Sequence, residues 1–245
     1  MKFPILLPKI FDYPFTYETD LLLKVGDYVE VPFGKSKATG VVWDEFEKKT
    51  NKHFIIKKIS KKLNVPTLNK NTIKFLNWFS EYNMIPKGMA LKFLLLSSNI
   101  VEKLDKKNYL PFKLNIKNSF FNLSKEQEES FEKIIYDIKK FRVHVLQGTT
   151  GSGKTIVYFE ALKKVIKNGF QGLIMLPEIG LTSQFEKRFK EFFGFNPAIW
   201  HSGVSKRRKE IIWSGINEGK IKVLIGARSS LFLPFKKLGL IIVDE

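Results

Sequence analysis

The sequence contains no cysteine, and none of its apolar runs approaches the ~20 residues that a membrane-spanning helix needs. The absence of cysteine excludes a cysteine-ligated metal site and thiol redox chemistry within these residues, and it fits a reducing compartment. The N-terminal stretch MKFPILLPKIFDYPF does not predict a signal peptide, because Pro4 and Pro8 interrupt the apolar region and no small-residue cleavage site follows. We therefore expect a cytoplasmic protein without a membrane partner.

Acidic residues are also scarce relative to basic ones. The 245 residues include 42 Lys and Arg but only 24 Asp and Glu, which gives a formal net charge of +18. Such an excess favours a polyanionic partner, nucleic acid before membrane. Only five of the basic residues are Arg, and Asn, Ile and Phe are abundant, as expected from an AT-rich genome. Part of the charge is therefore compositional, and it supports a nucleic-acid partner without deciding for one.

The first hundred residues predict a small β-rich module with helices, which we place at residues 1–98. Apolar and polar residues alternate within residues 21–43, with turn signals between them, and HFIIKKIS (53–60) is consistent with one further strand. The segment 69–83 carries apolar residues at helical spacing, and MALKFLLL (89–96) predicts a second helix after Pro86.

From residue 123 onward the pattern changes to alternating helices and strands. Residues 99–122 show neither period and are the predicted linker. LSKEQEESFEKIIYDIKK predicts a helix capped by Ser124, with Gln127 placed to complete a capping box. Four short apolar runs predict strands of a parallel sheet: 143–147, 172–177, 221–227 and 238–244. We therefore expect a doubly wound α/β domain over residues 123–245.

The strongest chemical signal is GTTGSGKT, which matches G-x-x-x-x-G-K-[ST] between a predicted strand and a predicted helix. In such a loop, backbone N–H groups and the helix N-terminus surround phosphate. Lys154 is expected to reach the β- and γ-phosphates of ATP, and the Thr155 hydroxyl to ligate Mg²⁺. The predicted nucleotide-binding loop comprises Gly148, Thr149, Thr150, Gly151, Ser152, Gly153, Lys154 and Thr155.

The last run, LGLIIVDE, predicts the second half of the same site. An apolar strand that ends in Asp244 presents a carboxylate beside the phosphate loop, where it holds the hydrated Mg²⁺ ion. Glu245 follows directly and is the predicted general base for the attacking water. The predicted catalytic residues are thus Lys154, Asp244 and Glu245, and the pair favours an ATP-hydrolysing motor over a kinase or a GTPase switch.

Three further segments lie at the ends of predicted strands: LPEIGLTSQ (176–184), WHSGVSKRR (200–208) and GARSSLFLPF (226–235). Their hydroxyl, backbone N–H and basic groups are suited to nucleic-acid phosphates. Taken singly, each also has a purely structural interpretation, since His201 fits a structural histidine and KRRK (206–209) a solvated helix face.

Taken in order, these segments and IGARSSLFLPFKKLGLIIVDE closely resemble the first motor lobe of the PriA (primosomal protein N′) family of replication-restart helicases, in helicase superfamily 2. The resemblance implies a RecA-like P-loop lobe and makes Gln127, in LSKEQ, an adenine contact. It places six residues in segments that touch single-stranded DNA: Thr182, Gln184, His201, Ser202, Arg228 and Ser229.

The front module resembles the 3′-end DNA-binding domain of the same family through FDYPF (11–15), KVGDYVEVPFGK (24–35) and GVVW. The resemblance implies that Phe11, Asp12 and Tyr13 hold the 3′-terminal nucleotide of the nascent leading strand. Chemically, the two rings can stack on a base and the carboxylate can accept from a 3′-hydroxyl. A buried aromatic pair beside a turn is the structural alternative.

The family pattern differs from this sequence in two respects. The linker of about two dozen residues leaves no room for the winged helix that the family commonly inserts. The second motor lobe with its arginine finger, and a cysteine-rich zinc module, would lie beyond Glu245, so zinc is expected only there. We therefore expect the N-terminal portion of an enzyme truncated within its Asp-Glu motif, which would bind DNA but turn over little ATP alone.

By resemblance, the intact protein would be an ATP- and Mg²⁺-dependent 3′ to 5′ helicase acting at abandoned replication forks. Its implied partners are forked and single-stranded DNA, primosome proteins and single-strand-binding protein. Two alternatives stay open: another superfamily 2 translocase, RecG-like or restriction-type, and a DNA-binding fragment without enzymatic activity.

Overall fold

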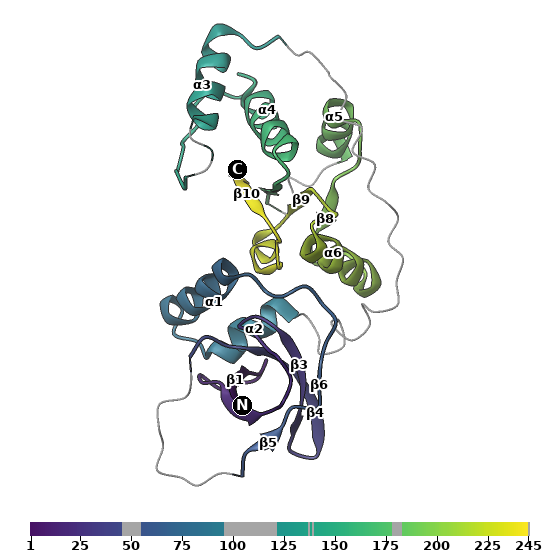
Figure 1. Ribbon diagram of the computed structural model, residues 1–245. Helices are drawn as coiled ribbons and strands as arrows, with labels where there is room; N and C mark the ends of the chain where they lie inside the picture. Colours follow the sequence, from purple (N-terminus) through teal and green to yellow (C-terminus); the bar gives the residue numbers. More distant parts are fainter. Residues whose placement is uncertain (46–54, 96–121, 137, 139, 178–182, 245) are drawn as a thin grey trace. The chain divides into compact units, whose positions relative to one another are not determined.

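The computed structural model describes residues 1–45, 55–95, 122–136, 138, 140–177 and 183–244 (Figure 1). The chain forms two compact units. The first unit comprises Met1–Tyr109 together with Phe232–Lys236, and the second comprises Leu110–Leu231 together with Lys237–Glu245. The predicted linker at 99–122 lies almost wholly outside the described residues, with only residue 122 inside them. The short segment 232–236 therefore belongs to the first unit although its neighbours in sequence belong to the second.

The first unit is built on a six-stranded sheet in the order β5-β2-β1-β4-β3-β6. The central strands are antiparallel, with β4 between β1 and β3. The strands are β1 (Lys2–Leu6), β2 (Phe15–Glu18), β3 (Tyr28–Phe33), β4 (Ser36–Val42), β5 (Lys57–Lys58) and β6 (Lys61–Lys62). Alternating side chains of β1, β3 and β4 form the core, including Ile5, Val29 and Val31, which are fully buried. The predicted β-rich module is confirmed.

Two helices accompany this sheet. Helix α1 (Lys70–Tyr82) begins at Asn69, whose side chain accepts from the Thr72 N–H, and α2 (Lys87–Leu95) follows it after a short turn. Helix α1 buries Ile73 and Leu76 but leaves Trp78 and Tyr82 exposed. Both helices correspond to the segments in which apolar spacing predicted them.

The segment 232–236 completes the first unit. The ring of Phe232 lies 5.5 Å from Phe75 and 4.8 Å from Phe79 on α1, and 5.2 Å from Phe93 on α2. The Asn69 amide donates a 2.6 Å hydrogen bond to the Phe235 carbonyl. Three aromatic side chains of the two helices therefore pack around a residue that follows them by more than a hundred positions.

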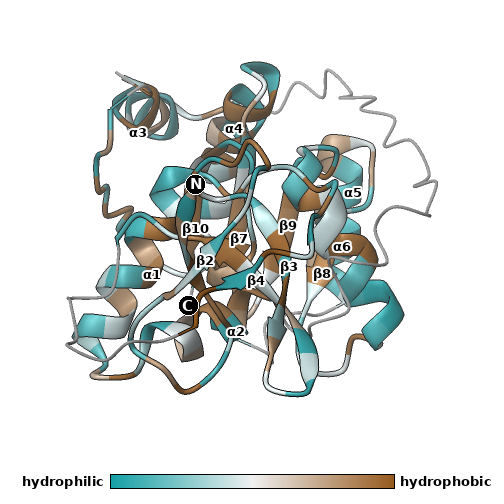
Figure 2. Ribbon diagram, turned by 60° about the horizontal axis from the view of Figure 1, so that its bottom comes forward, coloured by the Kyte–Doolittle hydropathy of each residue, from teal (hydrophilic) through white to brown (hydrophobic). Residues whose placement is uncertain are grey.

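The second unit contains a four-stranded, fully parallel sheet in the order β10-β7-β9-β8. Its strands are β7 (Gln171–Met175), β8 (Ala198–Trp200), β9 (Val223–Gly226) and β10 (Leu238–Val243). The hydrophobic colour in Figure 2 is concentrated on β7, β9 and β10. The predicted strands at 172–177, 221–227 and 238–244 are confirmed, and with them the α/β fold class.

The helices of this unit are α3 (Lys125–Ile135), α4 (Lys154–Lys167), α5 (Ser183–Phe193) and α6 (Lys206–Glu218). Helix α4 packs on β7 and β10, and α3 packs on α4. Phe159 on α4 meets Phe189 and Phe193 of α5 in an aromatic core with ring centroids 5.6 and 5.2 Å away. The predicted capping box of α3 is confirmed, with Ser124 and Gln127 bonding each other's backbone N–H.

One predicted strand is wrong. Residues 143–147 (VHVLQ) form no strand in this structure, and Val143 and Val145 are 78% and 91% exposed. The apolar run has strand propensity, but His144 interrupts it and strand formation depends on pairing with a neighbour. Strand β10 is therefore an edge strand of the sheet, and among the described residues it pairs only with β7.

A search of the described residues for a helix with the length and hydropathy of a membrane span gives none.

Candidate functional site

The predicted phosphate loop is exposed over residues 148–152 and leads directly into α4. Gly153 precedes the helix with φ +83°, a left-handed conformation that glycine adopts without strain. The first turn of α4 has neither a side-chain cap nor an acidic residue. The positive end of the helix is therefore available to an anion such as a phosphate group.

Lys154 folds back over this loop. Its ammonium group donates hydrogen bonds of 2.6 Å to the Gly148 carbonyl and 3.1 Å to the Thr149 carbonyl. These carbonyls hold the charged group at the centre of the loop. A phosphate oxygen bound there could replace the carbonyls as the acceptor, because an ammonium group has three donors and a stronger preference for an anion.

A cavity of about 640 Å³ opens beside the loop. Asp244, at the carboxyl end of β10, lies on its wall with Lys154 and Thr155. The residues that line it are Thr150, Gly151, Ser152, Gly153, Lys154, Thr155, Ile156, Phe159, Arg188, Glu191, Phe192 and Asp244. A helix N-terminus, an ammonium, a hydroxyl and a carboxylate around one cavity form a donor set that fits a nucleotide phosphate with Mg²⁺. Among the described residues there is no cluster of three or more His, Asp or Glu that could hold a metal without such a ligand.

Gln127 links α3 to the phosphate loop. Its amide nitrogen donates to the Ser152 carbonyl at 3.0 Å, and its amide oxygen accepts from the Ser124 N–H at 3.0 Å. A Cβ at Gly153 would collide with this amide, so glycine is required there for close approach as well as for its φ value. Both polar ends of the predicted adenine contact are thus engaged within the protein in this structure.

Tyr158 connects the two predicted metal-binding side chains. Its hydroxyl donates a 2.6 Å hydrogen bond to Oδ2 of Asp244 and also hydrogen-bonds the Thr155 side chain. The side chain is buried, and its ring packs on Phe159 in the core. Burial, and then the Asp244 carboxylate, raise the pKa of Tyr158 well above its usual value, so the hydroxyl keeps its proton at neutral pH.

The carboxyl ends of β7, β9 and β10 form a second, smaller hollow of about 350 Å³. It is lined by Met175, Leu176, Pro177, Ala227, Arg228, Ser229, Val243 and Asp244. Ligands of open parallel sheets bind at this edge, because the loops after neighbouring strands converge there. Asp244 therefore lines both this hollow, together with the predicted DNA contacts Arg228 and Ser229, and the phosphate-loop cavity.

The other predicted DNA contacts of this unit are spread along the same edge. His201 and Ser202 follow β8; the His201 Nδ1 accepts from the Gly203 N–H at 3.2 Å, and the Ser202 carbonyl accepts from Lys209 Nζ at 3.1 Å. Gln184 is exposed at the start of α5. Thr182 and Glu245 lie outside the described residues.

In the first unit, Phe11 and Tyr13 belong to an aromatic cluster. The Phe11 ring lies 5.8 Å from Tyr13, 5.0 Å from Phe15 and 6.0 Å from Phe33. Phe11 is half-buried, Tyr13 is 37% exposed and Asp12 is exposed, so the two rings are not the buried pair of the structural alternative. The cluster therefore combines a packed base with an accessible aromatic edge and a carboxylate.

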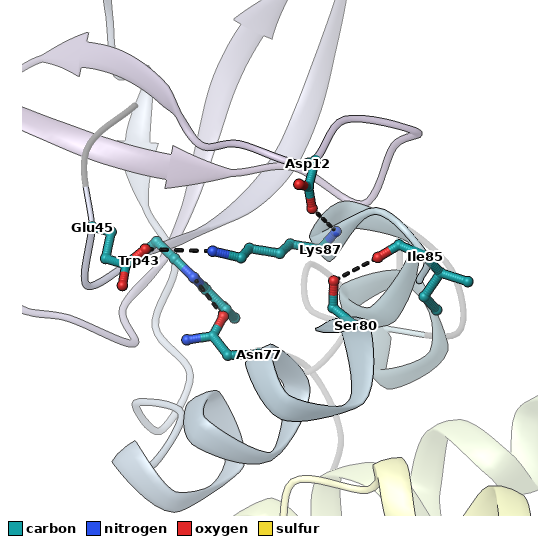
Figure 3. Close-up of polar contacts among 7 residues, drawn as sticks. All are labelled: Asp12, Trp43, Glu45, Asn77, Ser80, Ile85 and Lys87. Carbon is teal, nitrogen blue, oxygen red and sulfur yellow. Dashed lines mark hydrogen bonds and ion pairs between the residues drawn. The ribbon is translucent and has the colours of Figure 1, made fainter. Parts of the chain in front are cut away.

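Asp12 is fixed at the start of α2, as Figure 3 shows. Its Oδ1 accepts a 3.1 Å hydrogen bond from the Lys87 N–H, and the Lys87 ammonium lies 3.4 Å from Glu45. The adjacent Gly88 donates its N–H to the Phe11 carbonyl at 3.0 Å, and a Cβ there would collide with the Leu7 and Lys9 carbonyls. This close approach ties the FDYPF loop to the helix and leaves the second Asp12 oxygen for a ligand.

Sequence reasoning missed residues that line the phosphate-loop cavity and also Tyr158, which hydrogen-bonds Asp244 on its wall. Tyr158 follows Thr155 by three positions, and this spacing places the two on the same face of α4. The helical register could therefore have identified it. Arg188 and Glu191 reach the cavity from α5, and no local pattern in the sequence connects that helix to the loop.

Comparison with known proteins gives two family matches. Residues 3–95 match the 3′ DNA-binding domain (3′BD) of PriA, and residues 124–245 match the DEAD/DEAH box helicase family. The matches cover the FDYPF module and the phosphate-loop unit in turn.

Individual relatives extend along nearly the whole chain. A replication restart protein PriA from Rickettsia conorii is 40% identical over 98% of this chain and 36% of its own length. Its counterpart from Rickettsia felis is 39% identical over the same shares. The PriA of Bacillus subtilis is 42% identical over 50% of this chain and 16% of its own length. The chain thus spans about a third of the length of the rickettsial relatives.

Proposed function

The chain belongs to the PriA family of replication restart proteins, and from this we propose that it supplies the fork-recognising and ATP-binding part of a DNA helicase. The first unit would bind the 3′ end of a nascent leading strand at a stalled or abandoned fork. The second would bind ATP and single-stranded DNA as one RecA-like motor lobe. In the whole protein, ATP hydrolysis would drive 3′ to 5′ movement and allow the primosome to assemble.

The observation that carries fork recognition is the exposed Asp12 carboxylate held at the start of α2 beside a cluster of aromatic rings. A terminal nucleotide offers two features that an internal one lacks, a free 3′-hydroxyl and an unstacked base face. Asp12 can accept a hydrogen bond from the hydroxyl, and Tyr13, which packs against Phe11, can stack on the base.

The motor role rests on the arrangement around Asp244. Lys154 and the α4 N-terminus would bind the phosphates, Thr155 and Asp244 would hold Mg²⁺, and Glu245 would accept a proton from the attacking water. The metal would neutralise charge on the phosphates, and Gln127 would contact the adenine. Asp244 also lines the second hollow, beside Arg228 and Ser229. DNA bound in that hollow would therefore lie next to Asp244, the proposed ligand of Mg²⁺.

The remaining assignments follow the family. Thr182, Gln184, His201 and Ser202 would contact single-stranded DNA, and single-strand-binding protein and primosome proteins would be partners. We place the protein in the cytoplasm, where chromosomal forks occur, and expect a zinc module only outside these residues.

Fork binding tests this proposal. The chain should bind a fork with a free leading-strand 3′-hydroxyl about tenfold more tightly than a fork with a blocked 3′ end, as measured by fluorescence anisotropy. Asp12→Asn should abolish this difference, because the amide keeps its oxygen for the Lys87 N–H and replaces the second carboxylate oxygen with an NH₂ group, which cannot accept from the 3′-hydroxyl. Asp20→Asn, an exposed aspartate of the same unit, is the matched control.

Equal affinity of the wild-type chain for free and blocked ends would contradict fork recognition. It would favour a superfamily 2 translocase that binds DNA without reference to a 3′ terminus.

A further inference from the structure

Tyr158 occupies a position that neither the proposed ATP chemistry nor the family matches assign. Its hydroxyl donates to Asp244 Oδ2 at 2.6 Å and hydrogen-bonds the Thr155 side chain. Thr155 and Asp244 are the two residues proposed to hold Mg²⁺, and they come from α4 and β10. One buried hydroxyl therefore bridges both side chains of the proposed metal site.

The hydrogen-bond inventory of the three groups gives this bridge a direction. A threonine hydroxyl has one donor and two lone pairs, so ligating a metal through a lone pair requires its proton to point to some other acceptor. The Tyr158 oxygen is such an acceptor. The Tyr158 hydroxyl in turn donates its own hydrogen bond to Asp244. The hydrogen bonds therefore run from Thr155 through Tyr158 to the carboxylate.

We propose that Tyr158 is a positioning residue that orients Thr155 and Asp244 for Mg²⁺, an inference that rests on the proposed nucleotide site. Fixing Oδ2 of Asp244 leaves the other carboxylate oxygen for the hydrated ion, and the Thr155 lone pairs remain for direct ligation. Groups that hydrogen-bond metal ligands change metal affinity by about 10- to 100-fold when they are removed.

The surroundings of Tyr158 make it suited to this role. The side chain is 7% exposed, and its ring belongs to the core formed by α4, α5 and the sheet. A side chain packed in this way has a fixed rotamer, so the hydroxyl is held at one place relative to α4 and β10. The Tyr158 hydroxyl therefore fixes the position of Asp244, after β10, relative to Thr155 on α4.

Tyr158→Phe tests the inference, because it keeps the ring and removes only the hydroxyl. The experiment titrates Mg²⁺ into the 245-residue chain with a fluorescent ATP analogue and follows anisotropy, with a parallel measurement in EDTA. The Mg²⁺ concentration for half-maximal binding should rise about tenfold, whereas analogue affinity in EDTA should stay within about twofold of wild type.

Two matched variants interpret the result. Tyr17→Phe removes a buried hydroxyl that donates to the Pro32 carbonyl in the first unit, and it should leave both affinities unchanged. Lys154→Ala should weaken analogue binding with and without Mg²⁺, since it removes the phosphate contact itself.

The outcomes separate the inference from the proposed function. An unchanged Mg²⁺ dependence in Tyr158→Phe, with Lys154-dependent binding intact, would overturn the positioning role alone. Equal loss of affinity with and without Mg²⁺ would also overturn it, because that pattern indicates general damage to the site. Binding that is absent in the wild type, or insensitive to Lys154→Ala, would overturn the nucleotide site and the inference together.

Discussion

Asp27 shows how a single charged residue holds a turn of the first unit. The side chain is 2% exposed and accepts three hydrogen bonds, from the Lys24 N–H at 2.9 Å, Lys62 Nζ at 2.7 Å and the Thr67 hydroxyl at 2.9 Å. Burial alone would raise the pKa of Asp27, but these hydrogen bonds and the Lys62 charge outweigh it and hold the pKa below its usual value. The residue thus ties the end of one loop to β6 and to the approach to α1.

The lowered pKa predicts how stability depends on pH. A carboxylate whose pKa is depressed on folding stabilises the folded state above its unfolded pKa of about 3.9, and this stability is lost as pH falls through the lower folded value. Asp27→Asn should lower the free energy of unfolding of the first unit by about 1–3 kcal/mol at pH 7, with a smaller difference near pH 3. Urea unfolding followed by tryptophan fluorescence measures this.

Asp20→Asn is the control for this prediction, since Asp20 is exposed and should show little effect at either pH. A loss of stability in Asp27→Asn that is equally large at both pH values would argue against the charged hydrogen bonds as its cause.

At the scale of elements, the segment 232–236 is the feature on which the first unit depends most unexpectedly. Phe232 packs among Phe75, Phe79 and Phe93, and Asn69 bonds the Phe235 carbonyl. The same residue ends the 3-10 turn η3 (Arg228–Phe232), which begins at a proposed DNA contact. The residue that packs against the helices of the first unit is therefore four positions from Arg228 in the chain.

Phe232→Ala should destabilise the first unit by about 2–3 kcal/mol, below the range for fully buried phenylalanines because Phe232 is half-buried. The loss follows from three ring contacts that alanine cannot make. Thermal unfolding measures this loss of stability, and hydrogen exchange distinguishes the unfolding of the first unit from that of the second. Phe141→Ala is the control, because Phe141 is 94% exposed. A melting temperature equal to that of the wild type would show that the segment adds no stability.

Sequence patterns predicted elements better than contacts. Apolar runs identified β7, β9 and β10 because each carries enough β-branched and aliphatic residues to define a buried strand. The same reasoning failed at residues 143–147, where propensity was present but no strand within the described part of the chain pairs with them. Strand β5 lies within the segment 53–60 in which a further strand was predicted, whereas β6 is a pair of lysines held partly by ion pairs to Asp27 and Glu30, which no hydrophobic pattern could indicate.

In the candidate site, too, residues with a local sequence pattern could be predicted and residues placed by tertiary contacts could not. The phosphate loop and Asp244 are recognisable because their spacing expresses local chemistry, and the structure places them around one cavity. Tyr158 was recoverable only from helical register. Arg188 was not recoverable, because it reaches the cavity from α5, which is distant from the loop in sequence, and its place depends on tertiary packing.

At the scale of the whole molecule, the exposure of the phosphate loop predicts slow ATP hydrolysis by this chain. Residues 148–152 are exposed, and the preceding residues 143–147 are not held in the sheet. An ATPase site accelerates hydrolysis by fixing the reacting groups and excluding bulk water, and an exposed loop does neither. The charge of +18 nevertheless favours DNA binding.

We therefore predict that the 245-residue chain binds DNA but hydrolyses ATP at less than about one hundredth of the rate of a full-length relative, with or without DNA. A coupled phosphate-release assay measures this. Lys154→Ala identifies any contaminating activity, because it should remove turnover that belongs to this site. Robust DNA-stimulated turnover that disappears in Lys154→Ala would contradict the prediction.

The late position of Phe232–Lys236 sets an order of events during synthesis. The helices that surround Phe232 leave the ribosome some 140 residues before it does. At about 5–20 residues per second, the first unit must wait roughly 7 to 28 seconds with Phe75, Phe79 and Phe93 not yet covered by Phe232. In this interval the three rings lack their contacts with Phe232, and a product released after the predicted linker would lack them permanently. The first unit can finish folding only when most of the second unit has been made.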